Sequence, residues 1–221
     1  MLELGCGTGR VLLSAASWGL EVTGVDASPQ MLDRARSRAL SLGMAGRVDL
    51  REAEMVDFDL GRKFQSIIAP LNALMHLMDD GSFSACLRRV AAHLLPGGRF
   101  FFDLCMPRPE FIADASLPGG IEVRQFKLRG RSWSQRESHS FDPISRISHI
   151  HHVFNTINDA PEETMETDLR LRFYGPEDWP PLFKAAGLRI LHLFGDFQSS
   201  PFDPDTAGFQ VGVAGLEPEG D

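Results

Sequence analysis

The feature that most constrains this chain is a glycine-rich turn that directly follows its first apolar segment. Residues 1–9 read MLELGCGTG, and the next apolar segment, EVTGVD, ends at the acid Asp26. Glycines let the backbone pass where any side chain would collide with a ligand. The acid follows the turn by about 20 residues, where an acid of a strand–helix–strand unit binds a ribose. Together they predict a site for a ligand that contains a nucleoside.

The glycine spacing distinguishes between such ligands. A dinucleotide fingerprint reads G-x-G-x-x-G, because a pyrophosphate lies on the helix N-terminus. Here the spacing is G-x-G-x-G, and the acid Glu3 precedes it. An acid at this point would repel a phosphate and attract an ammonium group. The spacing therefore favours a ligand with a cationic group, while a nicotinamide-dependent oxidoreductase remains an alternative.

The segments LELGCGTGR and VDASPQML resemble motifs I and II of the class I S-adenosylmethionine-dependent methyltransferases. The resemblance implies an enzyme that transfers a methyl group from S-adenosylmethionine to nitrogen or oxygen of a small metabolite. It also implies a Rossmann-like α/β fold. A non-catalytic member that binds the cofactor as a sensor or interaction module is a second alternative.

The same resemblance implies which residues bind the cofactor. Glu3 and the glycine turn would meet the methionine end, and Asp26 would accept both ribose hydroxyls. Met31 and Met55 would lie near the adenosine. Glu54 stands where the family places an acid, although this chain has Ala-Glu where most relatives have Gly-Asp. The predicted cofactor residues are Glu3, Gly5, Cys6, Gly7, Asp26, Met31, Glu54, Met55, Leu71 and Asn72.

The segment APLNALMHL, residues 69–77, follows the fourth predicted strand. Carboxyl ends of parallel strands line the ligand crevice, so this loop is expected to contact both cofactor and acceptor. It resembles the family pattern F-N-x-x-x-H-L, with Leu71 in the phenylalanine position. It lacks the N-P-P-Y with which nucleic-acid amino methyltransferases hold a flipped base. His76 is the predicted catalytic and substrate-binding residue, because imidazole titrates near neutral pH; a histidine satisfied by backbone groups is the alternative.

Strands and helices alternate through the first half, which predicts a mostly parallel sheet covered by helices. The expected strands are 1–4, 21–25, 47–51, 64–69 and 99–104, and the expected helices are 10–18, 29–42 and 83–94. Ser28 and Pro29 are a typical helix start. The run Pro96-Gly97-Gly98 is expected to break the chain before the fifth strand.

The second half predicts an antiparallel β insertion, because turn signals separate segments rich in β-branched and aromatic residues. Its expected strands are 121–128, 132–141, 146–157 and 164–173. A helix at 176–186 and a closing strand pair at 188–195 and 207–214 follow, with the last strand antiparallel. We expect a cofactor-binding domain from 1–118 and 174–216, and a lid or substrate subdomain from 119–173.

Three further residues are predicted to bind the acceptor. His149 and His151 share one face of a strand, because side chains alternate along it. Tyr174 stands at the junction between the insertion and the last helix. No acid or cysteine spacing accompanies the histidines, so a metal site is not expected.

Composition restricts the partners. The net charge of −8 argues against binding to a nucleic-acid backbone. The 3 cysteines form no C-x-x-C pair, and no apolar run approaches the ~18 residues of a membrane helix. A cytoplasmic protein is expected. The turn begins at residue 5, so any segment that closes over the cofactor is expected from upstream sequence, from the insertion or from a partner subunit, as in a homodimer.

Overall fold

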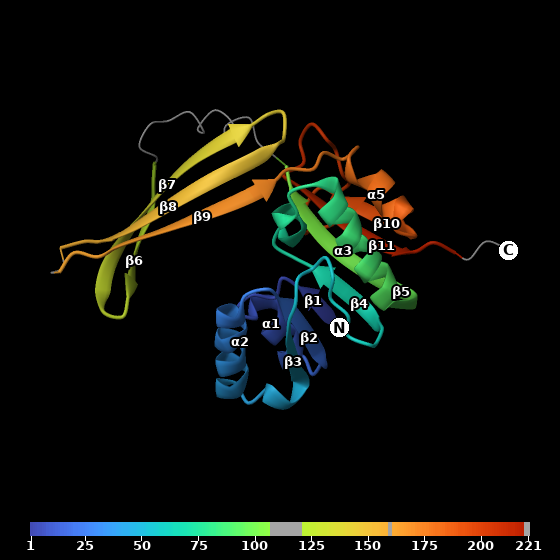
Figure 1. Cartoon of the computed structure of the whole chain (residues 1–221), viewed down its shortest axis with the longest axis horizontal. Coiled ribbons are helices and arrows are strands. Elements are labelled where there is room, and N and C mark those ends of the chain that lie inside the picture. Colours follow the sequence, from blue (N-terminus) through green and yellow to red (C-terminus); the bar gives the residue numbers. More distant parts are fainter. Residues whose placement is uncertain (107–120, 159–160, 219–221) are drawn as a thin grey trace. The chain divides into compact units, whose positions relative to one another are not determined.

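The computed structural model describes residues 1–106, 121–158 and 161–218, and its chain divides into two compact units (Figure 1). One unit comprises 1–106 with 174–221, and the other comprises 107–173. The predicted boundary between residues 118 and 119 lies outside the described residues. The described part of the chain contains no helix with the length and apolar character needed to cross a membrane.

The first unit is built on a seven-stranded sheet in the order β10-β11-β5-β4-β1-β2-β3. Its strands are β1 Leu2–Leu4, β2 Val22–Asp26, β3 Val48–Glu52, β4 Phe64–Ala69, β5 Leu94–Cys105, β10 Leu188–Phe194 and β11 Phe209–Leu216. The first five strands pair in parallel, and β11 runs antiparallel between β5 and β10. The predicted Rossmann-like class, with an antiparallel last strand, is confirmed.

Helices cover this sheet in two groups. They are α1 Arg10–Ser17, α2 Pro29–Ser41, α3 Asp80–His93 and α5 Trp179–Ala185, with the 3-10 turns η1 Ala45–Arg47 and η2 Ala73–His76. Helices α1 and α2 contact β2 and β3, whereas α3 and α5 contact each other, β5 and β10 (Figure 1). Helix α2 begins as expected, since the Ser28 hydroxyl accepts the Met31 N–H at 3.3 Å and Pro29 follows the cap.

The short strand β1 is stable in the centre of the sheet because both neighbours pair with it. Leu2 and Leu4 are fully buried. On the side of α3 and α5 the core is aromatic, and the Phe102 ring lies 4.9 Å from Phe183 and 5.4 Å from Trp179. These contacts pack helix α5 against strand β5.

Several predicted elements differ in extent. Helix α3 begins at Asp80, three residues earlier than expected, because the Asp79 carboxylate caps it by accepting the Ser82 N–H. Strand β5 begins at Leu94, ahead of the expected break at Pro96-Gly97-Gly98. The Pro-Gly-Gly run does not end the strand. It coincides with an irregularity in the sheet, where the register between β4 and β5 shifts between Phe64 and Ser66. Helix α5 begins later than expected, at Trp179, because the Gly175 N–H donates to the Asp178 carboxylate at 2.6 Å and closes a turn ahead of it.

The second unit is a four-stranded antiparallel sheet in the order β6-β7-β8-β9. Its strands are β6 Ile121–Leu128, β7 Arg131–Asp142, β8 Ile147–Thr156 and β9 Thr164–Arg172. Each strand pairs with the next along the chain, in agreement with the predicted antiparallel insertion.

Candidate active site

The glycine turn between β1 and α1 has the backbone that only glycine adopts without cost. Gly5, Gly7 and Gly9 have φ of +65°, +52° and +77°, in the left-handed region. Asp26, at the end of β2, accepts the Gly7 N–H at 2.7 Å on one oxygen and the Ser28 N–H at 2.9 Å on the other. The Asp26 carboxylate thus fixes the backbone of the glycine turn and of the residue that caps α2. Each oxygen keeps a further lone pair for a ligand.

A cavity of about 310 Å³ opens beside this turn. It is lined by Gly5, Asp26, Ala27, Glu54, Met55, Pro70, Leu71, Ala73 and His76. These residues follow the carboxyl ends of β1, β2, β3 and β4, where ligands bind in open α/β sheets. Of the predicted site residues, Gly5, Asp26, Glu54, Met55, Leu71 and His76 therefore meet in one place.

Glu3 lies beneath the turn and is 2% exposed. Its Oε2 atom has no hydrogen-bond partner. Burial raises the pKa of the carboxyl group to about 8, although a backbone N–H of Leu12 and the charge of Arg10 act in the opposite direction. A buried oxygen without a partner is costly. Glu3 is not among the residues that line the cavity, although Gly5, two positions further along the chain, is.

His76 closes the cavity at the end of η2. Burial lowers its pKa below the usual 6.5, although the charge of Asp26 raises it. The imidazole is therefore mostly neutral at pH 7 and able to accept a proton. The loop that carries it begins with Leu71 and Asn72, whose backbone N–H groups both donate to Asp103 of β5.

Other predicted site residues lie outside the cavity lining. Cys6 is 4% exposed in the core, and burial raises its pKa to about 12. The side chain of Met31 is exposed on α2. Asn72 accepts the Cys105 N–H at 2.8 Å. Tyr174 is 1% exposed, and its hydroxyl already donates to the Leu77 carbonyl at 2.6 Å.

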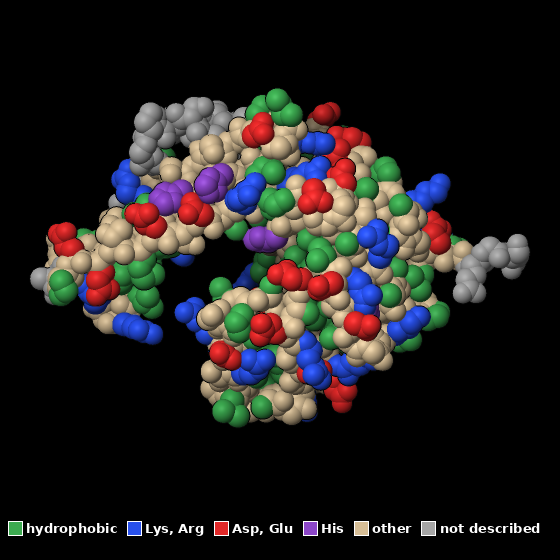
Figure 2. Space-filling view, in the orientation of Figure 1, with side chains coloured by type: hydrophobic (Ala, Val, Ile, Leu, Met, Phe, Trp, Pro, Cys, Tyr) green, Lys and Arg blue, Asp and Glu red, His purple; other side chains and the backbone are tan. Residues whose placement is uncertain are grey.

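His149 and His151 belong to the four-stranded sheet. His149 Nε2 lies 3.2 Å and His151 Nδ1 3.0 Å from the same Asp168 oxygen on β9. Figure 2 shows histidine and acidic side chains gathered on this surface. Within the residues that the structure describes, no group of three or more histidine, cysteine or acidic side chains could hold a metal ion.

The sequence analysis did not single out Ala27, Pro70, Ala73 or Asp103, although Pro70 and Ala73 belong to the loop that was expected to line the site. The first three are small or apolar residues next to predicted ones. Asp103 had a usable signal, since it is an acid near the carboxyl end of the fifth strand, in the apolar run FFFDLC.

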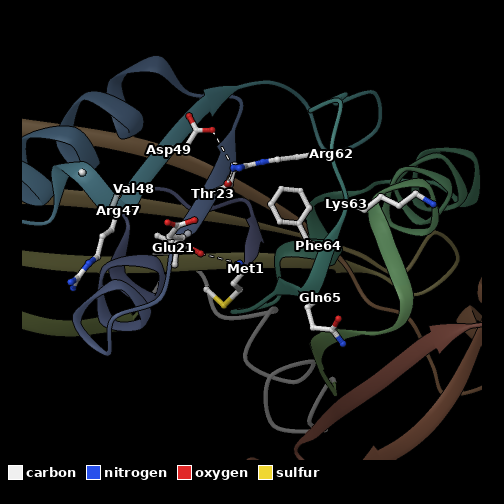
Figure 3. Close-up of a pocket in the computed structure, with 12 residues that line it drawn as sticks. Met1, Glu21, Thr23, Arg47, Val48, Asp49, Arg62, Lys63, Phe64 and Gln65 are labelled. Carbon is white, nitrogen blue, oxygen red and sulfur yellow. Dashed lines mark hydrogen bonds and ion pairs between the residues drawn. The ribbon is translucent and has the colours of Figure 1, made fainter.

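A second cavity, of about 420 Å³, lies at the amino-terminal ends of β2, β3 and β4 (Figure 3). One of its cations, Arg62, donates to the Thr23 hydroxyl, lies 3.4 Å from Asp49 and stacks over Phe64 at 5.0 Å. The charge of Arg62 is thus met by protein groups. The glycine turn, the Asp26 carboxylate and His76 are all at the other edge, which makes that edge the candidate site.

The chain is similar to known methyltransferases in sequence and in structure. A family model for a methyltransferase domain matches residues 1–98. The chain is 25% identical over 222 residues to the dTDP-3-amino-3,6-dideoxy-alpha-D-glucopyranose N,N-dimethyltransferase of Streptomyces fradiae, covering 99% of this chain and 78% of that protein. The CcbJ methyltransferase structure from Streptomyces caelestis superposes with a TM-score of 0.80 at 27% identity, covering 98% and 82% of the two chains.

These similarities support the predicted identification of the chain as a class I S-adenosylmethionine-dependent methyltransferase. The chain is accordingly a methyltransferase that uses S-adenosylmethionine. The predicted methyl transfer and the predicted cofactor are therefore confirmed. The solved CalS10 methyltransferase from Micromonospora echinaspora, in its S-adenosylmethionine-bound form, has the same fold with a TM-score of 0.71 at 22% identity and covers 96% of this chain.

Proposed function

We propose that this methyltransferase transfers methyl groups to the amino nitrogen of an amino sugar. The similarity to amino-sugar N,N-dimethyltransferases carries this proposal, because it spans almost the whole chain. The Streptomyces fradiae relative matches over 99% of the chain, and a dTDP-3-amino-3,4,6-trideoxy-alpha-D-glucopyranose N,N-dimethyltransferase of Streptomyces venezuelae matches over 96% at 26% identity. Both matches therefore include the four-stranded sheet as well as the cofactor half.

In this proposal the unpartnered Glu3 oxygen receives the ammonium group of the cofactor. A buried carboxylate gains most from a cation that it can pair with, because pairing removes the cost of leaving it alone. Asp26 offers its remaining lone pairs to the ribose hydroxyls, and Met55 lines the adenosine side. The residues present thus fit S-adenosylmethionine at its cationic and its hydroxyl-bearing ends.

His76 takes the role of proton acceptor. Bound S-adenosylmethionine supplies an electrophilic methyl group on a positively charged sulfur. A sugar amine is largely protonated at neutral pH, and its nitrogen has no free lone pair until that proton leaves. A neutral imidazole in the cavity can accept this proton. The remaining task of the protein is to align the acceptor and to exclude water.

The acceptor contacts are assigned to the four-stranded unit, with His149 and His151 as candidates. With Asp168 beside them, the histidines give this surface both hydrogen-bond donors and hydrogen-bond acceptors. Such a surface suits a sugar with hydroxyl and amino groups. Tyr174 is not retained as a candidate, because its hydroxyl is already bound.

The proposal is tested by incubating the protein with labelled S-adenosylmethionine and matched acceptors. The set contains a dTDP-linked amino sugar, the same sugar with a hydroxyl in place of the amine, and a phenol. Transfer to the amino sugar alone is expected. Transfer to the phenol or hydroxyl sugar, with none to the amine, would overturn the assignment.

A further inference from the structure

Two consecutive residues at the start of the loop between β4 and η2 have left-handed backbone. Leu71 and Asn72 both have φ of +61°. Asparagine tolerates this region, but leucine pays roughly 1–2 kcal/mol for it. Leu71 is also 53% exposed beside the cavity. Burial of this side chain therefore does not compensate the strain, and another interaction must hold the backbone.

That interaction comes from Asp103 on β5, which is 3% exposed. Its Oδ1 accepts the Leu71 N–H at 2.7 Å, and its Oδ2 accepts the Asn72 N–H at 2.9 Å. Short bonds to a carboxylate are the stronger kind of hydrogen bond. Each oxygen of one buried acid thus binds one residue of the left-handed pair.

A second bond ties the same loop to the same strand. The Asn72 side-chain oxygen accepts the Cys105 N–H at 2.8 Å. The loop is therefore anchored to β5 at Asp103 and at Cys105. Beyond the anchor it supplies Ala73 and His76 to the cavity, and Leu71 lines the cavity from the anchor itself.

We propose that Asp103 is a positioning residue for methyl transfer. Its carboxylate holds Leu71 and Asn72 in the left-handed conformation, and this fixes Leu71, Ala73 and His76 against the cofactor cavity. The proposal rests on the cavity being the cofactor site. Burial raises the pKa of Asp103 while the two N–H groups lower it.

The first test is Asp103→Asn. Asparagine has the same shape as aspartate, but its side-chain NH2 group would face the backbone N–H of Leu71 or Asn72 and could not accept a hydrogen bond from it. We expect the affinity for S-adenosylhomocysteine, measured by calorimetry, to fall at least about tenfold, and kcat to fall with it. Asp196→Asn is the matched control, because Asp196 also accepts two backbone N–H groups, at 2.9 Å from Gln198 and Ser200, and does not line the cavity. It should leave the affinity unchanged.

The second test asks whether Asp103 acts through the strained backbone. Leu71→Gly removes the strain, because glycine adopts positive φ freely. Asp103→Asn should therefore cost at least about threefold less affinity in the Leu71→Gly background than in the wild type. If Asp103→Asn alone does not fold, the double variant still tests the proposal, because Leu71→Gly should then restore folding.

An unchanged affinity in Asp103→Asn, an equal loss in both backgrounds, or a double variant that stays unfolded would overturn the positioning role. A wild-type protein that binds no S-adenosylhomocysteine would instead refute the cofactor cavity, which is a separate failure.

Discussion

Asp26 illustrates how one side chain can serve both fold and ligand. It holds the Gly7 and Ser28 N–H groups, and it lines the cavity. Asp26→Asn should weaken S-adenosylhomocysteine binding by about 1.5–3 kcal/mol, because ribose hydroxyls lose a charged acceptor. Calorimetry measures this. Asp33→Asn, an exposed acid on α2 paired with Arg36, is the control and should bind as the wild type does. Equal affinity in all three proteins would exclude Asp26 from the ribose site.

Glu3 makes a different residue-scale prediction, about pH. Its pKa is about 8 in the folded protein, compared with 4.5 for an ordinary glutamate. The folded state therefore binds the proton more tightly, and this contribution to the free energy of unfolding is lost as pH rises from about 4.5 to about 8. Glutamine does not titrate, so the free energy of unfolding of Glu3→Gln should not fall in this way as pH rises. The ligand-free variant should therefore be more stable than the wild type at pH 8 by up to about 4 kcal/mol.

Chemical denaturation at pH 5 and pH 8 measures this difference. The same variant should bind S-adenosylhomocysteine more weakly, because a neutral amide oxygen accepts a weaker hydrogen bond from an ammonium group than a carboxylate does. A difference between wild type and variant that does not change with pH would contradict the buried, protonated state of Glu3.

At the scale of elements, the loop that contains η2 carries His76, the predicted proton acceptor. The pKa of His76 is lowered, so the acid limb of the pH–rate profile should lie below pH 6.5. His76→Gln should lower kcat about 10²-fold or more and remove that limb. His192→Gln on β10 is the control, because this exposed histidine stacks on Phe194 away from the cavity lining. A retained acid limb in His76→Gln would assign the proton to another group.

The same loop shows where sequence reasoning succeeded and where it failed. Its place after a parallel strand predicted that it would line the site, since strand ends meet at one edge. The left-handed pair could not be predicted, because Leu71 has no local preference for that backbone. It is held by Asp103, 31 and 32 positions away in sequence. Local signals such as the Ser28 cap were read correctly, whereas a conformation imposed by a distant carboxylate requires the fold.

For the whole molecule, the two sheets share no strand, so each is a hydrogen-bonded structure of its own. Among the residues that the structure describes, those that line the candidate cavity all belong to the first unit. If acceptor contacts come from the second unit, exchanging residues 107–173 for the matching segment of the Streptomyces fradiae relative should change acceptor preference alone. We expect the KM for the amino sugar to move toward that of the donor, while S-adenosylhomocysteine affinity stays within about twofold. The reciprocal exchange is the control and should move preference the opposite way. An unchanged acceptor preference in both chimeras, with cofactor affinity intact, would place acceptor recognition in the first unit.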